Sequence, residues 1–176
     1  MVVNSNQIRA LSGVQQPGLW RSDPYLERYQ VPGGGTVIFA LKPGDKLTVC
    51  DPEGRQPAEI VAFSAEGKPD PSALTSAKTQ PAEGLRAILS GAEQSALRVR
   101  AGLERCGFNL ADAQAIHLFA SDSLAGEEVQ FAVEREITCV VCAPGTPMAV
   151  NGQDPPTPLF AWVRRSEQQI LAEPNL

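Results

Sequence analysis

The sequence holds a single histidine, His117, among its 176 residues. Catalytic schemes of the serine–histidine or cysteine–histidine type need an imidazole as general base, so any such scheme here depends on that one residue. Basic side chains are also few, because 15 lysines and arginines stand against 20 aspartates and glutamates, giving a net charge of −5 at pH 7. Neutralising a run of phosphates requires the opposite balance. The composition therefore excludes a strongly basic nucleic-acid-binding protein.

Long hydrophobic runs are absent as well. No run reaches the roughly 18 apolar residues that a transmembrane helix needs. The first residues lack a basic segment followed by an apolar one, so we expect no signal peptide. Four cysteines are too few for a disulfide scaffold. We therefore expect a cytoplasmic protein with reduced thiols and no membrane association.

Glycine and proline are frequent, at 15 residues each, which favours short strands joined by turns. Alternating and apolar runs predict three early strands, and their short connections predict an antiparallel meander. These strands cover residues 36–41, 46–51 and 56–63. Helical spacing of apolar residues predicts helices over residues 83–90 and 93–106. Later strands are predicted at residues 115–120, 128–133, 137–142 and 159–164.

These elements predict an α+β fold that is mainly β, an antiparallel barrel or sandwich-like sheet with two helices inserted in the middle. Residues 1–30 are predicted to form an irregular N-terminal arm, residues 31–165 a single β-rich domain, and residues 166–176 a tail or linker. The arm carries three aromatic residues, Trp20, Tyr25 and Tyr29. Large aromatics are favoured as interface anchors, so we expect a homo-oligomer or a contact with other domains. The alternative is that the arm covers its own domain.

The cysteines invite a metal-site hypothesis, which the local pattern disfavours. Cys139 and Cys142 lie three apart in a strand-like apolar run, so their side chains point to opposite faces. We interpret them, together with Cys50 and Cys106, as buried thiols that act as small apolar residues. His117 is interpreted as surface-facing or hydrogen-bonded, and no metal site is predicted in this chain.

Two charged stretches lie at strand ends. Asp51, Glu53, Gln56 and Glu59 fall within nine residues where one strand ends and the next begins. Carboxylates and an amide of this kind can hold an amine or guanidinium cation. An acidic turn without a ligand is the alternative. Arg164 and Arg165, at the end of the last strand, are interpreted as a solvated edge.

Three motifs carry a resemblance to a known family. The chain has VPGGG at residues 31–35, KPGDKLTV followed by DPEGRQ at residues 51–56, and NGQDPPTP at residues 151–158. In this order and spacing they resemble the urea-carboxylase-associated protein family. The middle of the chain is most similar to the version at the N-terminal part of trimethylamine-N-oxide demethylase (aldolase)-like proteins. The resemblance implies a β-rich fold, an aminomethyltransferase-like, tetrahydrofolate-binding neighbour domain, and Asp51, Glu53, Gln56 and Glu59 as substrate-binding residues.

The resemblance also implies zinc in some members, and here the sequence departs from the pattern. The segment after Phe63 carries neither cysteine nor histidine at the expected place, and Val150 stands where a cysteine precedes the NG motif. One hypothesis is therefore a degenerate, metal-less domain or subunit with an assembly or regulatory role. Zinc and tetrahydrofolate would then belong to partner domains of a lyase that demethylates small amines.

The second hypothesis is a small enzyme acting on an amine, amine oxide or guanidine, with Cys142 or His117 on a metal. A binding domain for a small cationic metabolite is the third. The sequence leaves open which of the three applies, and whether the chain is itself catalytic.

Overall fold

The computed structural model describes residues 23, 25–75, 78–120, 122–145 and 155–166. Trp20 and the motif residues 151–154 lie outside these ranges. The first half of the chain forms β1 (Leu26–Val31), β2 (Thr36–Leu41), β3 (Lys46–Asp51), β4 (Ala58–Phe63), a short 3-10 helix η2 (Pro71–Ala73) and β5 (Gln80–Pro81). The second half forms α1 (Glu83–Leu89), α2 (Gln94–Arg105), β6 (Gln114–Leu118), β7 (Glu127–Ala132), β8 (Ile137–Cys142) and β9 (Leu159–Arg164).

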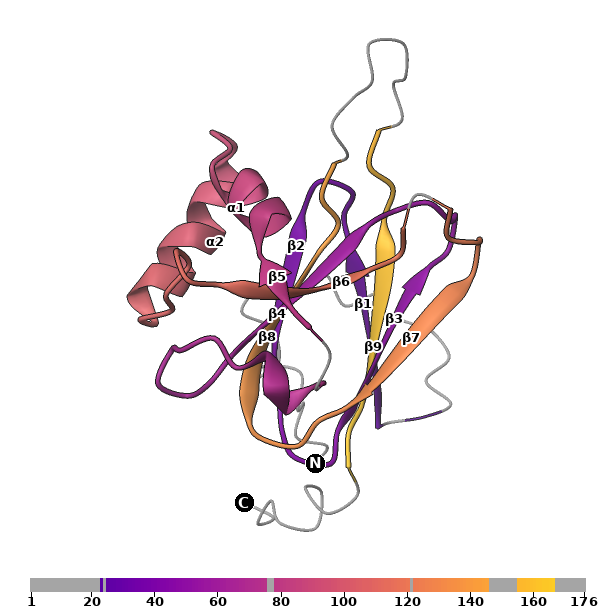
Figure 1. Cartoon of the computed structure of the whole chain (residues 1–176), viewed down its shortest axis with the longest axis horizontal. Coiled ribbons are helices and arrows are strands. Elements are labelled where there is room, and N and C mark those ends of the chain that lie inside the picture. The colour runs from indigo at the N-terminus through magenta and orange to yellow at the C-terminus, as the bar shows by residue number, and fades with distance from the viewer. Residues whose placement is uncertain (1–22, 24, 76–77, 121, 146–154, 167–176) are drawn as a thin grey trace, which may run out of the picture.

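The strands form two antiparallel sheets, and the two helices lie on one side of the molecule (Figure 1). One sheet has the order β1-β9-β3-β7 and the other the order β2-β8-β4-β6-β5. This confirms the predicted α+β fold that is mainly β. Within the described residues the sheets stay separate and form a sandwich, so the barrel alternative is excluded.

The predicted meander is wrong. β2 pairs with β8, β3 with β7 and β9, and β4 with β6 and β8. Each tight turn between β2, β3 and β4 carries the chain from one sheet to the other instead of back along the same sheet. The local pattern predicts the strands, but their partners come from distant parts of the chain.

Strand β1 lies inside the segment that the sequence assigns to an irregular arm. Tyr29 is fully buried in this chain's own core and stacks on Phe39 with ring centroids 4.8 Å apart. The expectation that Tyr29 anchors a partner is therefore wrong, because the strand pairs with β9 and places its ring between the sheets. Tyr25 remains 38% exposed.

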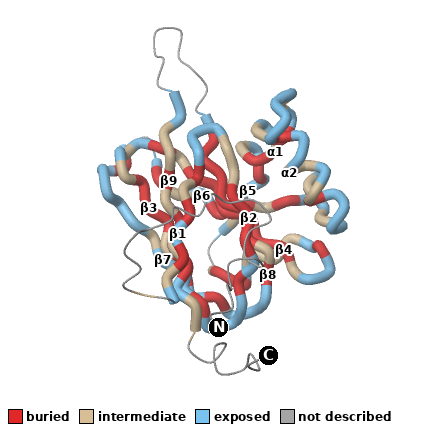
Figure 2. The backbone as a smooth tube through the Cα atoms, turned by 180° about the vertical axis from the view of Figure 1, so that it is seen from behind, coloured by how far each residue is buried: buried red, intermediate tan, exposed pale blue. Residues whose placement is uncertain are grey.

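Two apolar clusters build the interior, and both contact the five-stranded sheet. One fills the space between the sheets, and the other lies between that sheet and the helices. All six residues of β4 are consequently buried, since both of its faces are covered. Figure 2 shows the same layering, with buried residues concentrated in the central strands and exposed residues mainly on the turns and the outer side of the helices.

The thiols divide as the alternation predicts, with one exception. Cys139 lies in the cluster between the sheets and Cys142 in the cluster under the helices, which confirms that they point to opposite faces. Cys50 is also buried. Cys106 is exposed, so its predicted burial is wrong: helix α2 ends at Arg105 and leaves it at the rim.

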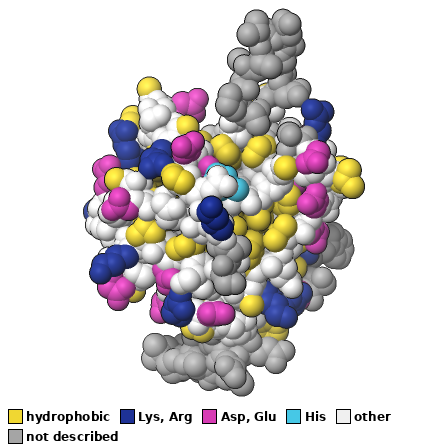
Figure 3. Space-filling view, in the orientation of Figure 1, with side chains coloured by type: hydrophobic (Ala, Val, Ile, Leu, Met, Phe, Trp, Pro, Cys, Tyr) yellow, Lys and Arg dark blue, Asp and Glu magenta, His cyan; other side chains and the backbone are white. Residues whose placement is uncertain are grey.

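No helix among the described residues is long and apolar enough to cross a membrane. Charged side chains of both signs are interspersed over the face shown in Figure 3.

Candidate functional site

The predicted site begins with Asp51 in the turn between β3 and β4. Its side chain is fully buried and accepts hydrogen bonds from the backbone N–H groups of Gly54 and Gln56, at 2.9 Å each. The Ser123 hydroxyl donates a third bond at 3.0 Å. Gly54 has φ +82°, and a Cβ there would lie 2.8 Å from the Ala125 nitrogen, so the turn requires glycine. Asp51 therefore organises the turn and joins it to the segment before β7.

Gln56 connects three segments through its side-chain amide. Its Nε2 donates to the carbonyl oxygens of Pro57 and Pro144, at 2.8 and 2.9 Å. Its Oε1 accepts a bond from the Thr157 N–H at 2.8 Å. The residue is only 4% exposed. Gln56 thus joins the segment after β8 and the segment before β9 to the start of β4.

Glu59 points from β4 to the first turn of α1. Its two carboxylate oxygens accept hydrogen bonds from the N–H groups of Gly84 and Leu85, each at 2.8 Å. Free N–H groups at a helix start favour a negative charge, so this buried carboxylate finds its compensation in the helix backbone. A Cβ on Gly84 would lie 2.8 Å from the Glu59 Oε1 and 2.7 Å from the Pro144 Cβ, and only glycine leaves room for the carboxylate.

The register places Cys142 and His117 on either side of Glu59. They are its direct cross-strand partners on β8 and β6, so all three side chains share the helix-covered face. The His117 Nε2 lies 3.8 Å from the Glu59 Oε1, and the Cys142 Sγ lies 3.9 Å from the Oε2. Burial, and after it the Glu59 charge, raises the pKa of the Cys142 thiol well above its ordinary value. Sequence reasoning missed this row because strand pairing was needed to align it.

The structure brings Asp51, Gln56 and Glu59 to one end of the sandwich, and we call these three residues the polar cluster. Glu53, the fourth predicted residue, is exposed in the turn. All three members of the cluster are bound by N–H groups of the chain itself. That these residues also bind a cation stays a prediction. No group of three or more histidine, cysteine, aspartate or glutamate side chains among the described residues is arranged to hold a metal ion.

The segments that carry the sequence motifs meet at the same end. Gly34 donates to the Ala143 carbonyl at 2.8 Å, and Gly33 lies so close to the Pro156 carbonyl that a Cβ would be 1.9 Å from its oxygen. The PGGG turn, the turn after β3 and the PPTP segment are therefore packed together around Gln56. The spacing of these motifs reflects a shared structural junction.

A second buried charged group lies at the opposite end of the sandwich, and we call it the arginine cluster. Arg165 binds Glu27 at 2.7 Å and Asp45 at 2.6 Å, and the Tyr29 hydroxyl donates to Glu27 at 2.6 Å. Its side chain is only 17% exposed, so its interpretation as a solvated edge is wrong. Arg164, 52% exposed and paired with Asp23, fits that interpretation.

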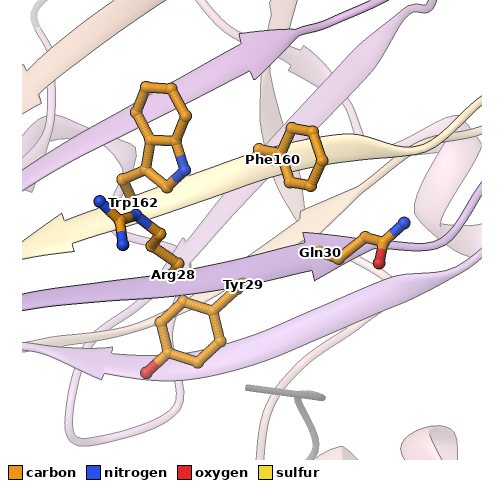
Figure 4. Close-up of a pocket in the computed structure, with 5 residues that line it drawn as sticks. All are labelled: Arg28, Tyr29, Gln30, Phe160 and Trp162. Carbon is orange, nitrogen blue, oxygen red and sulfur yellow. The ribbon is translucent and has the colours of Figure 1, made fainter. Parts of the chain in front are cut away.

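A shallow recess of about 200 Å³ opens on the outer face of β1 and β9. Arg28 lies opposite Trp162, and Gln30 opposite Phe160, while the ring of Tyr29 points to the other side of β1 (Figure 4). None of these residues belongs to the polar cluster. The patch is a surface feature that the sequence pattern did not single out.

Fold and site together define a helix-covered β-sandwich whose polar cluster joins strand ends and a helix start. No family model matches the chain. It is 38% identical over 156 residues to trimethylamine-oxide aldolase from Ruegeria pomeroyi, a match that covers 88% of this chain. The chain spans only 20% of that protein's length. This similarity supports the predicted relationship to trimethylamine-N-oxide demethylase-like proteins, whereas membership of the urea-carboxylase-associated family stays a prediction.

Proposed function

We propose that this chain is a non-catalytic, metal-free part of an enzyme related to trimethylamine-oxide aldolase, and that it serves assembly or regulation. The observation that carries the proposal is the internal satisfaction of the polar cluster. Asp51, Gln56 and Glu59 accept hydrogen bonds from backbone groups of their own chain. Carboxylates used in this way stabilise the fold, and both Glu59 oxygens already have a backbone donor.

The residues around Glu59 do not fit zinc. Zinc is held by thiolates, neutral imidazoles and carboxylates in a tetrahedral set. The raised pKa of Cys142 keeps its thiol protonated at neutral pH, and both Glu59 oxygens face helix N–H groups. In our proposal zinc and tetrahydrofolate therefore belong to other domains of the enzyme.

The similarity to trimethylamine-oxide aldolase also supports a proposal in which catalysis belongs to other parts of a larger enzyme. The curated relative extends far beyond the stretch that this chain matches. A domain of this size inside a larger enzyme can position its neighbours without touching substrate. The lyase activity on a methylated amine is then a property of the whole assembly.

The test uses the purified chain alone. We expect metal analysis to find no stoichiometric zinc, and we expect no formaldehyde from trimethylamine N-oxide, with or without added zinc and tetrahydrofolate. Trimethylamine N-oxide, dimethylamine and guanidine should leave the thermal unfolding temperature unchanged. Formaldehyde release, or about one zinc per chain, would instead support the small-enzyme hypothesis.

A melting temperature raised by one of these amines and lost in Glu53→Gln would support the cationic-metabolite hypothesis. Glu53 suits this purpose because it is exposed and forms no part of the buried junction. A Lys68→Gln variant, which changes an exposed charge in a different loop, is the matched control.

A further inference from the structure

A groove of about 730 Å³ runs between helix α2 and strand β2, and no member of the polar cluster lines it. Its apolar floor is formed by Ile38, Val99, Leu103 and Phe108. Ile38 and Leu103 are buried in the cluster under the helices, whereas Val99 and Phe108 are only partly covered. A volume of this size falls within the range of ligand-binding clefts.

The strand wall of the groove is a sheet edge. β2 is the outermost strand of its sheet and pairs only with β8. The Ala143 N–H donates to the Gly35 carbonyl, and the two-residue alternation of an antiparallel pair then turns the backbone groups of Thr36 and Ile38 away from β8. The Ala40 carbonyl confirms this direction, since it accepts a bond from Arg165 instead of from β8. No described residue hydrogen-bonds to the N–H and C=O groups of Thr36 and Ile38.

The helix wall of the groove is positively charged. Arg98 and Arg105 both line it, and both are exposed. They are seven positions apart in the sequence, which is about 10 Å along a helix axis. Among the described residues neither guanidinium has a carboxylate partner. An occupant with carboxylates therefore finds unpaired cations along this wall.

Gly102 lies on the same wall, between the two arginines. A Cβ added there would meet no atom within 4 Å, so the packing of the chain itself does not require glycine. Alanine inside a helix is more favourable than glycine by about 1 kcal/mol. A ligand backbone that approaches the helix closely would benefit from the missing side chain.

From these observations we propose that the groove binds an extended acidic peptide segment of a partner protein, which adds as a strand to the free edge of β2. Strand addition satisfies backbone groups at such an edge, and pockets for alternate side chains supply the specificity. Apolar side chains of the peptide would contact Val99, Leu103 and Phe108, and its carboxylates would pair with Arg98 and Arg105. A fatty acid would satisfy the cations but leave the backbone groups of β2 without partners. The proposal goes beyond the assembly role proposed above and does not depend on the identity of the enzyme.

Chemical labelling of Cys106 can report whether the groove is occupied. This thiol lines the groove and is exposed, whereas Cys50, Cys139 and Cys142 are buried. A maleimide fluorophore should therefore label Cys106 of the native full chain first. The probe is an acetylated, amidated hexapeptide with glutamate at positions 1 and 5, leucine at position 3 and threonine elsewhere, so that one face of the added strand presents both kinds of side chain to α2. Its dissociation constant is measured by isothermal titration calorimetry.

At about ten times its dissociation constant, the acidic peptide should slow labelling about tenfold by mass action. The same peptide with lysine in place of glutamate should not protect, nor should a version methylated on alternate backbone nitrogens. The methylated version keeps every side chain but loses the donors for strand addition. An Arg98→Glu/Arg105→Glu variant should reverse the preference toward the lysine peptide.

Gly102→Leu fills the groove from the helix side and should abolish protection, while its thermal unfolding shows that the fold is retained. The matched control is Ala101→Leu on the same helix, because Ala101 is exposed and does not line the groove. Protection by decanoate equal to that by the acidic peptide would overturn strand addition. The absence of any binding, or equal protection by the methylated peptide, would overturn it as well. None of these outcomes bears on zinc or amine chemistry, so the function proposed above is tested separately.

Discussion

The two ends of the sandwich bury carboxylates by different means. At one end Asp51 and Glu59 face backbone N–H groups, and no lysine or arginine in the described part of the chain binds them. At the other end Glu27 and Asp45 share the guanidinium of Arg165. Burying a charge is costly unless it is paired and hydrogen-bonded. The first end meets this requirement with neutral donors, whereas the second adds a cation to such donors, since the Lys42 and Ser166 N–H groups also bind Asp45.

The difference predicts how each end responds to mutation. Removing the one cation of the arginine cluster leaves two buried carboxylates without a compensating charge. A cluster that depends on several backbone donors loses stability in smaller steps. Burial alone would lower the pKa of Arg165, but its hydrogen bonds and charge interactions with Glu27, and then with Asp45, together raise it, so the cation persists at all accessible pH values.

The largest effect is expected from Arg165→Met. Removing one partner of a buried ion pair leaves an uncompensated charge, which typically costs about 3–5 kcal/mol. Here Glu27 and Asp45 lose their cation, although the Tyr29 hydroxyl still binds Glu27 and the Lys42 and Ser166 N–H groups still bind Asp45. The Ala40 carbonyl also loses a donor. Urea unfolding should therefore show a marked loss of stability.

Arg164→Met is the control, because that arginine lies next in sequence but is half exposed in its pair with Asp23. Its unfolding midpoint should change little. Equal effects of the two variants would mean that the arginine cluster is not a special contributor to stability.

A smaller loss is expected from Gln56→Ala in the polar cluster. The substitution leaves the buried Pro144 carbonyl and the Thr157 N–H without their amide partner. A buried group left unsatisfied costs about 1–3 kcal/mol. Gln130→Ala removes an exposed amide with one bond of 3.3 Å to Thr48 and serves as control. If both variants unfold at the same urea concentration, the junction at Gln56 contributes nothing measurable.

The sequence predicts features that depend on neighbouring residues, but not contacts between residues that are far apart along the chain. The strand bounds Thr36–Leu41, Lys46–Asp51 and Ile137–Cys142 were predictable, because alternation and turn residues act over a few positions. The pairing of those strands was not, since it depends on contacts between distant segments. The same holds for the helices, whose apolar faces predict a covering layer but not which sheet it covers.

For the site, the sequence pointed to Asp51, Gln56 and Glu59 but not to their partners. Gln56 binds Thr157 across 101 positions, and Asp51 binds Ser123 across 72. The arginine cluster was missed for the same reason, because Glu27, Asp45 and Arg165 come from three separate strand ends. A charged residue at a strand end can be solvated or buried, and only the packing of the other ends distinguishes the two.

Alkaline pH should affect the stability of the two ends differently, and this can be tested without mutation. Burial raises the pKa of the thiols of Cys139 and Cys142, so the folded state keeps protons that the unfolded state releases above about pH 8.5. This contribution is fully present below that pH and is lost as the pH rises, by about 1.4 kcal/mol per pH unit for each thiol. Arg165 stays charged throughout this range.

Urea unfolding at several pH values above about 8.5 measures the slope. Cys142→Ala, beside Glu59, should make it shallower, whereas Cys106→Ala should leave it unchanged because that thiol is exposed. The same slope in all three proteins would contradict the protonated state assigned to Cys142.

The smallest effect, but the one with the clearest sign, comes from two glycines in the helices. Glycine to alanine inside a helix normally stabilises by about 1 kcal/mol, and we expect that gain for Gly102→Ala, where the added Cβ meets open space. At Gly84 the added Cβ would lie 2.8 Å from the Glu59 Oε1 and 2.7 Å from the Pro144 Cβ. Overpacking costs about 1–3 kcal/mol, which offsets the helix gain and leaves a net loss of about 1 kcal/mol. Opposite shifts of the urea midpoint would show that Glu59 depends on close contact with the start of α1. A gain at both positions would mean that the Glu59 carboxylate can move away from α1 without cost. The polar cluster would then not be held as rigidly as the arginine cluster.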